Sequence, residues 1–174
     1  FLNQANFVSS PTQTAVDMLL AHGLSVPNRP VSNGVDLERF NPTISAADVR
    51  KRYRLPDKPI VLYVGRLDGE KRMDVWLKAA PLVRKHIDAH FLIGGRGGEL
   101  NKLKRLAAEL RIANHVTFAG MVPDELLPAF YRTGTVFAIS SPAELQSIVL
   151  LEAMASGLPA VAASSCSMTL MAAS

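Results

Sequence analysis

Short apolar runs alternate with amphipathic segments along most of this chain. Runs of strand length occupy residues 6–10, 59–65, 89–95, 115–120, 135–140 and 159–163. Helical periodicity predicts helices over residues 12–22, 46–53, 72–86, 99–110, 124–131 and 148–156, with Gly23 ending the first and Gly157 the last. Strands that alternate with helices form right-handed crossovers and a parallel sheet covered on both faces. We therefore expect an α/β fold with a Rossmann-like, doubly wound parallel sheet.

A connector separates the first strand and helix from this regular series. Residues 29–42 contain Pro30, Gly34 and Pro42 and show neither helical nor strand periodicity. We expect residues 1–29 to be the tail end of a preceding domain with its linker, and residues 30–174 to be the main domain. Because the sequence opens without Met and inside an expected strand, we interpret it as part of a longer parent protein.

Composition is ordinary, but the charge is unevenly placed. Hydrophobic residues make up 48% and charged residues 20%, as in a soluble domain, and no apolar run approaches the roughly 20 residues that span a membrane. Residues 50–111 hold 16 Lys and Arg against 7 Asp and Glu, whereas the remainder holds 3 against 8. This basic block suits an anionic partner such as a diphosphate, an acidic membrane surface or nucleic acid. The alternative is a set of solvated helix faces.

Several kinds of chemistry lack the residues they need. Cys166 is the single cysteine, which excludes an internal disulfide and a cysteine metal cage and suits a reducing cytoplasm. The four histidines are scattered, so we interpret them as structural or surface residues. Gly-x-Ser-x-Gly, HExxH and CxxC motifs are absent from the sequence. We expect no metal site.

The best candidate loops are those that follow the strands, because a doubly wound sheet binds ligands at the carboxyl ends of its strands. They are residues 65–71, 94–98, 120–124 and 140–147. In the first, "GRLDGEK", Arg66 and Lys71 flank a turn that opens a helix. Helix N-termini attract anions, so two cations there predict a diphosphate site. The alternative is that Lys71 pairs with Asp68 or Glu70 on the surface.

The second loop, "GGRGG", places Gly94 and Gly95 directly after a strand. It has neither the Walker lysine and hydroxyl pair nor the spacing of a dinucleotide-binding fingerprint. These glycines let the backbone approach a ligand, or they form only a tight turn.

The fourth loop and its helix, "SSPAELQSIVLLEAMASGLPAVA", are the most informative segment. Backbone N–H groups of Leu145, Gln146 and Ser147 lie at the helix start and can hold a phosphate. Glu152 lies within the helix among apolar residues, where a carboxylate needs a partner. Such a group can accept two hydrogen bonds from a ribose diol. The alternative for Glu144 or Glu152 is a capping or ion-paired residue on an exposed face.

Three segments together resemble the C-terminal half of family 4 (group 1) glycosyltransferases. They are "VSNGVDLERFNP", "LYVGRLDGEKRMDVWLKAAPLV" and the stretch from "HVTFAG" to "LPAVA", and the resemblance covers about residues 1–163. It implies a GT-B fold, with this sequence supplying the nucleotide-sugar-binding half. It also implies retaining transfer of a sugar from a UDP- or GDP-sugar to a glycan or lipid acceptor, with no cofactor and no protein-bound metal.

The resemblance also implies a role for each matching position. Arg66 and Lys71 would neutralise the donor diphosphate, and Glu144 would lie by the donor sugar. Glu152 would bind the ribose hydroxyls. The remaining implied contacts are the backbone of Leu145, Gln146 and Ser147 with sugar hydroxyls and phosphate, and Met121 and Val122 with the base. Residues 33–36, "NGVD", would mark the crossing from the acceptor domain.

The sequence departs from the family pattern in three places. The position three after Glu144 is often Gly in the family and here is Ser147, a good helix cap. Almost all of the N-terminal acceptor domain is missing, and the sequence ends soon after the "LPAVA" strand. An isolated nucleotide-binding fragment without catalytic activity is therefore the first alternative, and a nucleotide-sugar epimerase is the second. We expect a cytoplasmic location, no nucleic-acid partner, and peripheral contact of the basic block with an anionic membrane.

Overall fold

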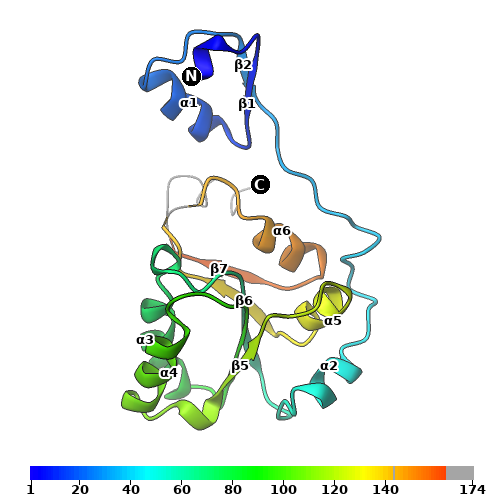
Figure 1. Ribbon diagram of the computed structural model, residues 1–174. Helices are drawn as coiled ribbons and strands as arrows, with labels where there is room; N and C mark the ends of the chain where they lie inside the picture. The colour runs from blue at the N-terminus through cyan, green and yellow to red at the C-terminus, as the bar shows by residue number, and fades with distance from the viewer. Residues whose placement is uncertain (143, 164–174) are drawn as a thin grey trace.

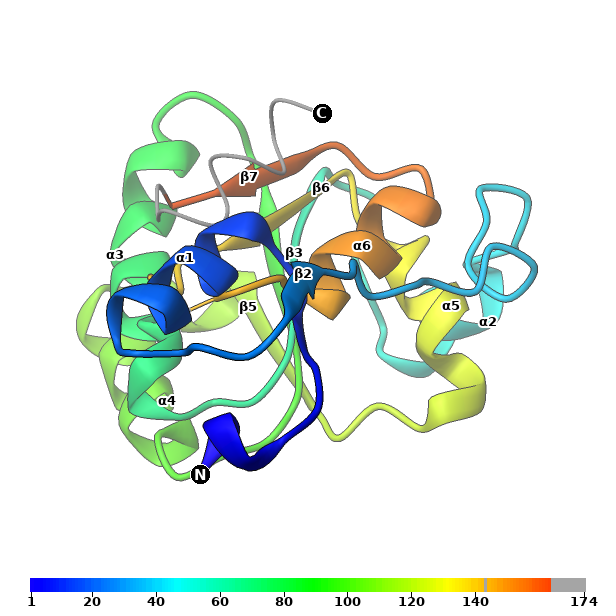
Figure 2. The same ribbon diagram turned by 90° about the horizontal axis from the view of Figure 1, so that it is seen from above.

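The computed structural model describes residues 1–142 and 144–163 as a five-stranded parallel sheet with helices on both faces, preceded by a small separate sheet (Figure 1). The five strands are β3 (Ile60–Val64), β4 (His90–Gly94), β5 (Val116–Gly120), β6 (Val136–Ile139) and β7 (Ala160–Ala162). Helices α3 (Met73–Arg84) and α4 (Leu100–Glu109) cover one face. Helices α2 (Ala47–Arg52), α5 (Leu127–Tyr131) and α6 (Ile148–Ala155) lie on the other side (Figure 2). The expected doubly wound α/β fold is confirmed.

The order of the strands is the feature that locates a ligand site. The sheet runs β5-β4-β3-β6-β7, so its first strand in the sequence, β3, lies in the middle between β4 and β6. This is the 3-2-1-4-5 order of Rossmann-like sheets, in which the winding direction reverses between the first and the fourth strand. Ligands bind at the crevice that this reversal opens at the carboxyl ends of the strands.

Continuous apolar runs build the centre of the sheet, as covered parallel strands require. All five residues of β4 are buried, and Ile60, Leu62 and Tyr63 of β3 are exposed by no more than 1%. Helix α3 packs Trp76 onto the sheet edge-to-face with Phe91, and the indole Nε1 donates to the Ala138 carbonyl at 2.9 Å. The base of the candidate loops is therefore a rigid, closely packed core.

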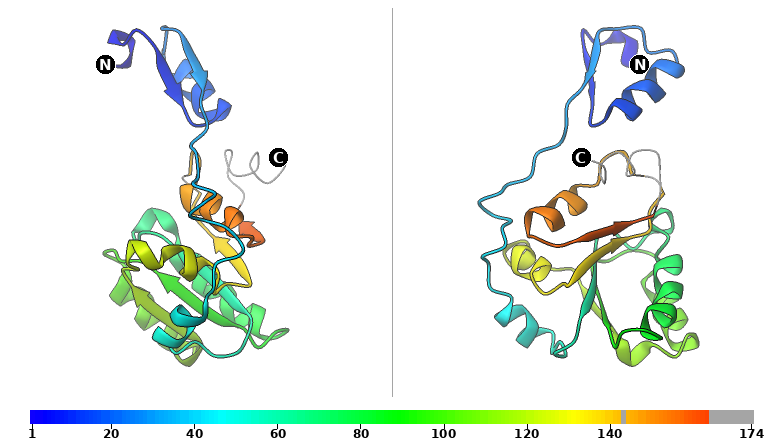
Figure 3. Two further views of the ribbon diagram at one scale, coloured as in Figure 1. Left: turned by 90° about the vertical axis from the view of Figure 1, so that its right-hand side faces the viewer. Right: turned by 180° about the vertical axis from the view of Figure 1, so that it is seen from behind.

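A separate β–α–β unit precedes this body. Strands β1 (Val8–Ser10) and β2 (Asn28–Pro30) pair in parallel, and helix α1 (Gln13–Ala21) connects them. Figure 3 shows an extended segment leading from this unit along the main body to α2. Strand β2 falls inside the segment that we expected to be a connector, and the short "NRP" run shows no strand pattern of its own. The domain division at residue 30 stays a prediction.

Two other local expectations change. The expected helix over residues 124–131 is a 3₁₀ turn, Asp124–Leu126, followed by the five-residue α5, and Pro128 lies at the start of that helix. Further 3₁₀ turns occur at Leu2–Gln4, Gly69–Lys71 and Ala113–His115. Ser147 occupies the N-cap position of α6, but its hydroxyl makes no capping bond, whereas its carbonyl accepts from the Leu150 and Leu151 amides. Cys166 lies outside the described residues.

Candidate donor-binding site

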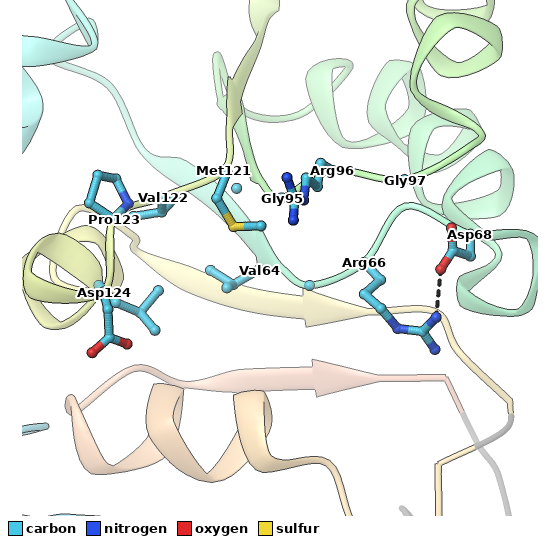
Figure 4. A pocket seen from close by; sticks show the side chains of 13 residues that line it. Val64, Arg66, Asp68, Gly95, Arg96, Gly97, Met121, Val122, Pro123 and Asp124 are labelled. Carbon is cyan, nitrogen blue, oxygen red and sulfur yellow. Dashed lines mark hydrogen bonds and ion pairs between the residues drawn. The ribbon is translucent and has the colours of Figure 1, made fainter.

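The loops after β3, β4 and β5 surround a cleft of about 980 Å³ (Figure 4). Its lining is formed by the ends of these strands and the residues that follow them: Val64, Gly65, Arg66, Asp68, Gly94, Gly95, Arg96, Gly97, Met121, Val122, Pro123, Asp124 and Leu127. Five of the residues predicted from sequence are among them: Arg66, Gly94, Gly95, Met121 and Val122. The strand-end rule thus led to a real concavity large enough for a nucleotide.

Two glycines in this cleft have a steric reason of their own. Gly95 has φ +146°, and a Cβ there would lie 1.8 Å from the Gly65 carbonyl oxygen. At Gly94 a Cβ would lie 2.7 Å from the Phe130 ring and 2.9 Å from the Val122 side chain. Gly95 therefore serves first to let the ends of β3 and β4 approach each other, and Gly94 makes room for the side chains of Phe130 and Val122. A role in approaching a ligand stays a prediction.

Arg66 is held at the cleft mouth by its own loop. One guanidinium nitrogen lies 2.6 Å from Asp68 Oδ2, the other pairs with Glu70, and the side chain is 66% exposed. Figure 4 shows the Arg66–Asp68 pair beside the open side of the cleft. An exposed pair of this kind is weak, so the guanidinium can exchange these partners for an anion at little cost.

Lys71 pairs with Glu144 across 73 positions of sequence, with 2.6 Å between Nζ and Oε1. Both side chains are largely buried, at 17% and 13% exposure. The Ser140 hydroxyl fixes the lysine backbone by donating to the carbonyls of Lys71 and Arg72. The surface pairing of Lys71 with Asp68 or Glu70 that we held as an alternative is wrong, because Arg66 takes both of those carboxylates.

This pair lies at the reversal point of the sheet. Lys71 follows β3 and Glu144 follows β6, and these two strands are neighbours in the sheet. A lysine and a carboxylate from the two sides of the crevice therefore meet where the fold is expected to bind ligands. Neither residue is part of the cleft lining described above, so the predicted donor residues form two adjoining groups.

Glu152 is half-buried in α6 and has the partner that its apolar setting requires. The Tyr131 hydroxyl donates to Glu152 Oε2 at 2.7 Å. Burial raises the pKa of the Glu152 carboxyl, while the Tyr131 hydrogen bond and the charge of Arg39 oppose that rise. Asp124, which lines the cleft, also raises the pKa of Glu152 by charge repulsion. Glu152 therefore lies within electrostatic reach of the cleft.

The helix-start residues differ in what they offer. Leu145 is exposed, and the Gln146 side chain reaches the segment that follows β2: its Oε1 accepts from the Asn33 amide and its Nε2 donates to Ser32 Oγ, both at 2.7 Å. The Ser147 side chain is 2% exposed, and its hydroxyl has no hydrogen-bond partner among the described residues. An unpaired buried hydroxyl at a helix N-terminus is suited to donate a hydrogen bond to an anion.

Sequence reasoning missed two residues of this region. Tyr131 and Arg39 both interact with Glu152, and Arg39 also forms an ion pair with Asp124 at 2.7 Å. The sequence indicated that Glu152, as a buried carboxylate, needs a hydrogen-bond donor. It did not single out Tyr131, which lies in an apolar helix. No sequence pattern indicated Arg39, because it lies in the connector.

The described residues offer neither a metal cluster nor a membrane-spanning helix. Within residues 1–142 and 144–163, no group of three or more His, Cys, Asp and Glu side chains is arranged to hold a metal ion. Among the helices of that same part of the chain, none is both long and apolar enough to cross a bilayer.

A comparison with protein families gives the class to which this fold belongs. The family model described as "Glycosyl transferases group 1" matches residues 46–172, and the chain belongs to this family. The family resemblance stated from the sequence is thus confirmed.

Individual relatives agree with this placement. The chain is 38% identical over 168 residues to the GDP-mannose-dependent alpha-(1-6)-phosphatidylinositol monomannoside mannosyltransferase of Mycobacterium tuberculosis, which aligns with 91% of this chain. It is 37% identical over 117 residues to the alpha-D-kanosaminyltransferase of Streptomyces kanamyceticus, covering 67% of this chain and 30% of that protein. The chain spans 43% of the length of the mycobacterial enzyme.

Solved structures share the fold. Sucrose-phosphate synthase from Thermosynechococcus elongatus superposes with a TM-score of 0.82 at 28% identity, over 97% of this chain and 43% of that one. The Anabaena protein HepE in complex with UDP-glucose gives a TM-score of 0.86 at 21% identity, over 96% of this chain and 47% of that one. The second likeness concerns the fold alone.

Proposed function

We propose that this chain is the donor-binding part of a retaining glycosyltransferase that uses a UDP- or GDP-sugar. The observation that carries the proposal is the Lys71–Glu144 pair at the reversal point of the sheet, beside the N-terminus of α6. A cation, a helix N-terminus and a carboxylate at one crevice suit a sugar linked to a diphosphate.

Each of these residues binds a different part of the donor. Lys71 and Arg66 bind the diphosphate and stabilise the charge that develops on the leaving nucleotide, with the N–H groups of Leu145, Gln146 and Ser147 at the start of α6. Glu144 accepts hydrogen bonds from the donor sugar. Glu152 accepts from the ribose diol, and Met121 and Val122 contact the base in the cleft. The positioned cations supply the electrostatic stabilisation, so we propose no cofactor and no protein-bound metal.

The names of the relatives suggest which donor and acceptor the parent protein uses. The mycobacterial relative is named for GDP-mannose and for a phosphatidylinositol monomannoside, and the Anabaena structure contains UDP-glucose. We accordingly propose a glycan or lipid acceptor for the parent, with peripheral contact between the basic block and an anionic membrane. A second candidate applies to this chain by itself: nucleotide binding without transfer. It is favoured by the span of 43% of the mycobacterial enzyme, since the acceptor side of the crevice needs further residues.

Nucleotide binding is tested by thermal unfolding. GDP or UDP is expected to raise the melting temperature by roughly 5–10 °C at one hundred times its Kd, because it binds only the folded state. Lys71→Ala and Glu152→Ala are expected to abolish the shift, since each removes a charged contact. Lys104→Ala, at an exposed position of α4, is the matched control and keeps the shift.

The outcomes separate the alternatives. A folded wild-type chain that shifts with neither nucleotide contradicts the intact donor site. For the parent, release of nucleoside diphosphate only when an acceptor is present supports transfer, whereas interconversion of the nucleotide sugar without acceptor supports an epimerase.

A further inference from the structure

Tyr131 is the most constrained neighbour of Glu152. Its side chain is 0% exposed, and its ring packs edge-to-face on Phe40 at 5.8 Å and against Phe137 at 6.1 Å. A ring enclosed in this way has one available orientation, so its hydroxyl is a fixed point. That hydroxyl donates to Glu152 Oε2 at 2.7 Å.

The direction of this hydrogen bond is set by the surroundings. Burial and the nearby carboxylate of Glu152 raise the pKa of the Tyr131 phenol, so the phenol keeps its proton and acts as the donor. Bonding to a carboxylate favours its charged form, and the Tyr131 bond lowers the pKa of Glu152 against the effect of burial. Tyr131 thus stabilises the charged acceptor as well as its position.

The two oxygens of Glu152 are therefore unequal. Oε2 is occupied by Tyr131, whereas Oε1 forms no hydrogen bond with any residue that the structure describes. The same carboxylate lies within electrostatic reach of Asp124 in the cleft wall. An acceptor held from behind by a rigid donor can present its remaining lone pairs in a fixed direction.

We propose that Tyr131 is a positioning residue that aims the Glu152 carboxylate at the vicinal diol of the nucleotide ribose. The inference rests on the proposed donor site and adds to it a determinant of ribose recognition. It assigns Tyr131 no contact with the nucleotide; Tyr131 acts through Glu152.

Titration calorimetry with the nucleoside diphosphate and its 2′-deoxy analogue tests the inference. Tyr131→Phe is expected to weaken ribonucleotide binding on the order of tenfold, because a hydrogen bond to a charged group is lost. It is expected to leave 2′-deoxynucleotide binding nearly unchanged, since the lost alignment matters only for the diol. Tyr53→Phe, the same change on a ring that directly follows α2 and packs on Phe130, is the matched control and alters neither affinity.

A second readout follows the carboxylate itself. In the ligand-free chain, the pKa of Glu152 measured by NMR titration is expected to rise in Tyr131→Phe and to stay at the wild-type value in Tyr53→Phe. This shift is expected of a positioning residue that bonds the carboxylate and not of a residue that only fills space.

Each result is decisive. Equal loss of affinity for the two nucleotides in Tyr131→Phe, or an unchanged ribonucleotide affinity, overturns the inference while leaving the donor site standing. A folded wild-type chain that binds neither nucleotide overturns the proposed function and this inference together.

Discussion

At the scale of the residue, the site is a set of charges that are already satisfied before any ligand arrives. Lys71 has Glu144, Arg66 has Asp68 and Glu70, and Glu152 has Tyr131. Buried charges require such partners, because an unpaired one costs several kcal/mol. A diphosphate must therefore replace the partners of Lys71 and Arg66, whereas the ribose diol meets the remaining oxygen of Glu152 without displacing Tyr131.

The charged form of Glu152 lowers the stability of the folded chain. Burial raises its pKa above 4.5 in the folded state, so the folded chain binds the proton more tightly than the unfolded chain. The unfolding free energy consequently falls as pH rises from about 4.5 through the raised pKa. Glu152→Gln keeps an acceptor for Tyr131 and removes the charge. It is expected to be more stable than wild type above this window and to lose that advantage below it.

Urea midpoints between pH 4 and pH 8 measure this difference. Glu109→Gln, the same change at an exposed position of α4, is the matched control. A stability difference between Glu152→Gln and wild type that is constant with pH would contradict the assignment.

At the scale of the element, the candidate loops are held by contacts between strand ends. The Gly65 amide donates to the Gly94 carbonyl and the Gly95 amide to the Gly120 carbonyl, which joins the ends of β3, β4 and β5. The Leu67 amide continues this contact by donating to the Arg96 carbonyl. The cleft floor is thus an extension of the sheet rather than a set of free loops.

Gly95→Ala is expected to disrupt this floor. A Cβ would meet the Gly65 carbonyl oxygen at 1.8 Å on a backbone with φ +146°, so the ends of two strands must move apart. We expect a loss of at least about 2 kcal/mol in the unfolding free energy measured by urea denaturation. Gly98→Ala, where a Cβ would have nothing within 4 Å, is the control. Equal stability of the two variants would count against the close approach.

Sequence periodicity predicted most helices and strands, but not the contacts between segments that are distant in the sequence. Five of the six expected helices and the strands of the main sheet lie where the pattern indicated, because burial of one face imposes a local repeat, whereas the first part of the expected helix over residues 124–131 is a 3₁₀ turn. Strand β2 was missed, since its pairing with β1 depends on a neighbour 20 positions away rather than on its own residues. The contacts Lys71–Glu144 and Tyr131–Glu152 likewise join distant segments, and single-sequence patterns carry no information on such distances.

At the scale of the whole molecule, the basic block contributes Arg66 and Lys71 to the candidate site, and most of its other cations lie elsewhere. The basic block includes α2, α3 and α4, whereas the carboxylates Glu144 and Glu152 belong to the opposite end of the chain. Exposed Lys78 and Lys102 line one groove between α3 and α4 together with Arg105, and they pair there with Asp74 and Glu99. This groove shares no residue with the cleft, so its lysines are suitable positions for testing the proposed contact with anionic lipid.

Vesicle co-sedimentation tests the membrane proposal. The chain is expected to bind vesicles that contain anionic lipid and to be released as salt screens the charges. Lys78→Glu combined with Lys102→Glu is expected to weaken binding, whereas Arg29→Glu, in the separate β–α–β unit, is the charge-reversal control. Binding that is indifferent to the anionic lipid content would remove this proposal.

The hydrogen bonds of the Gln146 side chain limit where the chain can be shortened. Both ends of its amide bond the segment at Ser32 and Asn33, so the loop before α6 is anchored to residues that precede the main sheet in sequence. A truncation that starts after Asn33 would delete this anchor and leave the loop held by the Lys71–Glu144 pair. A shortened chain that keeps the anchor therefore has to begin upstream of Ser32.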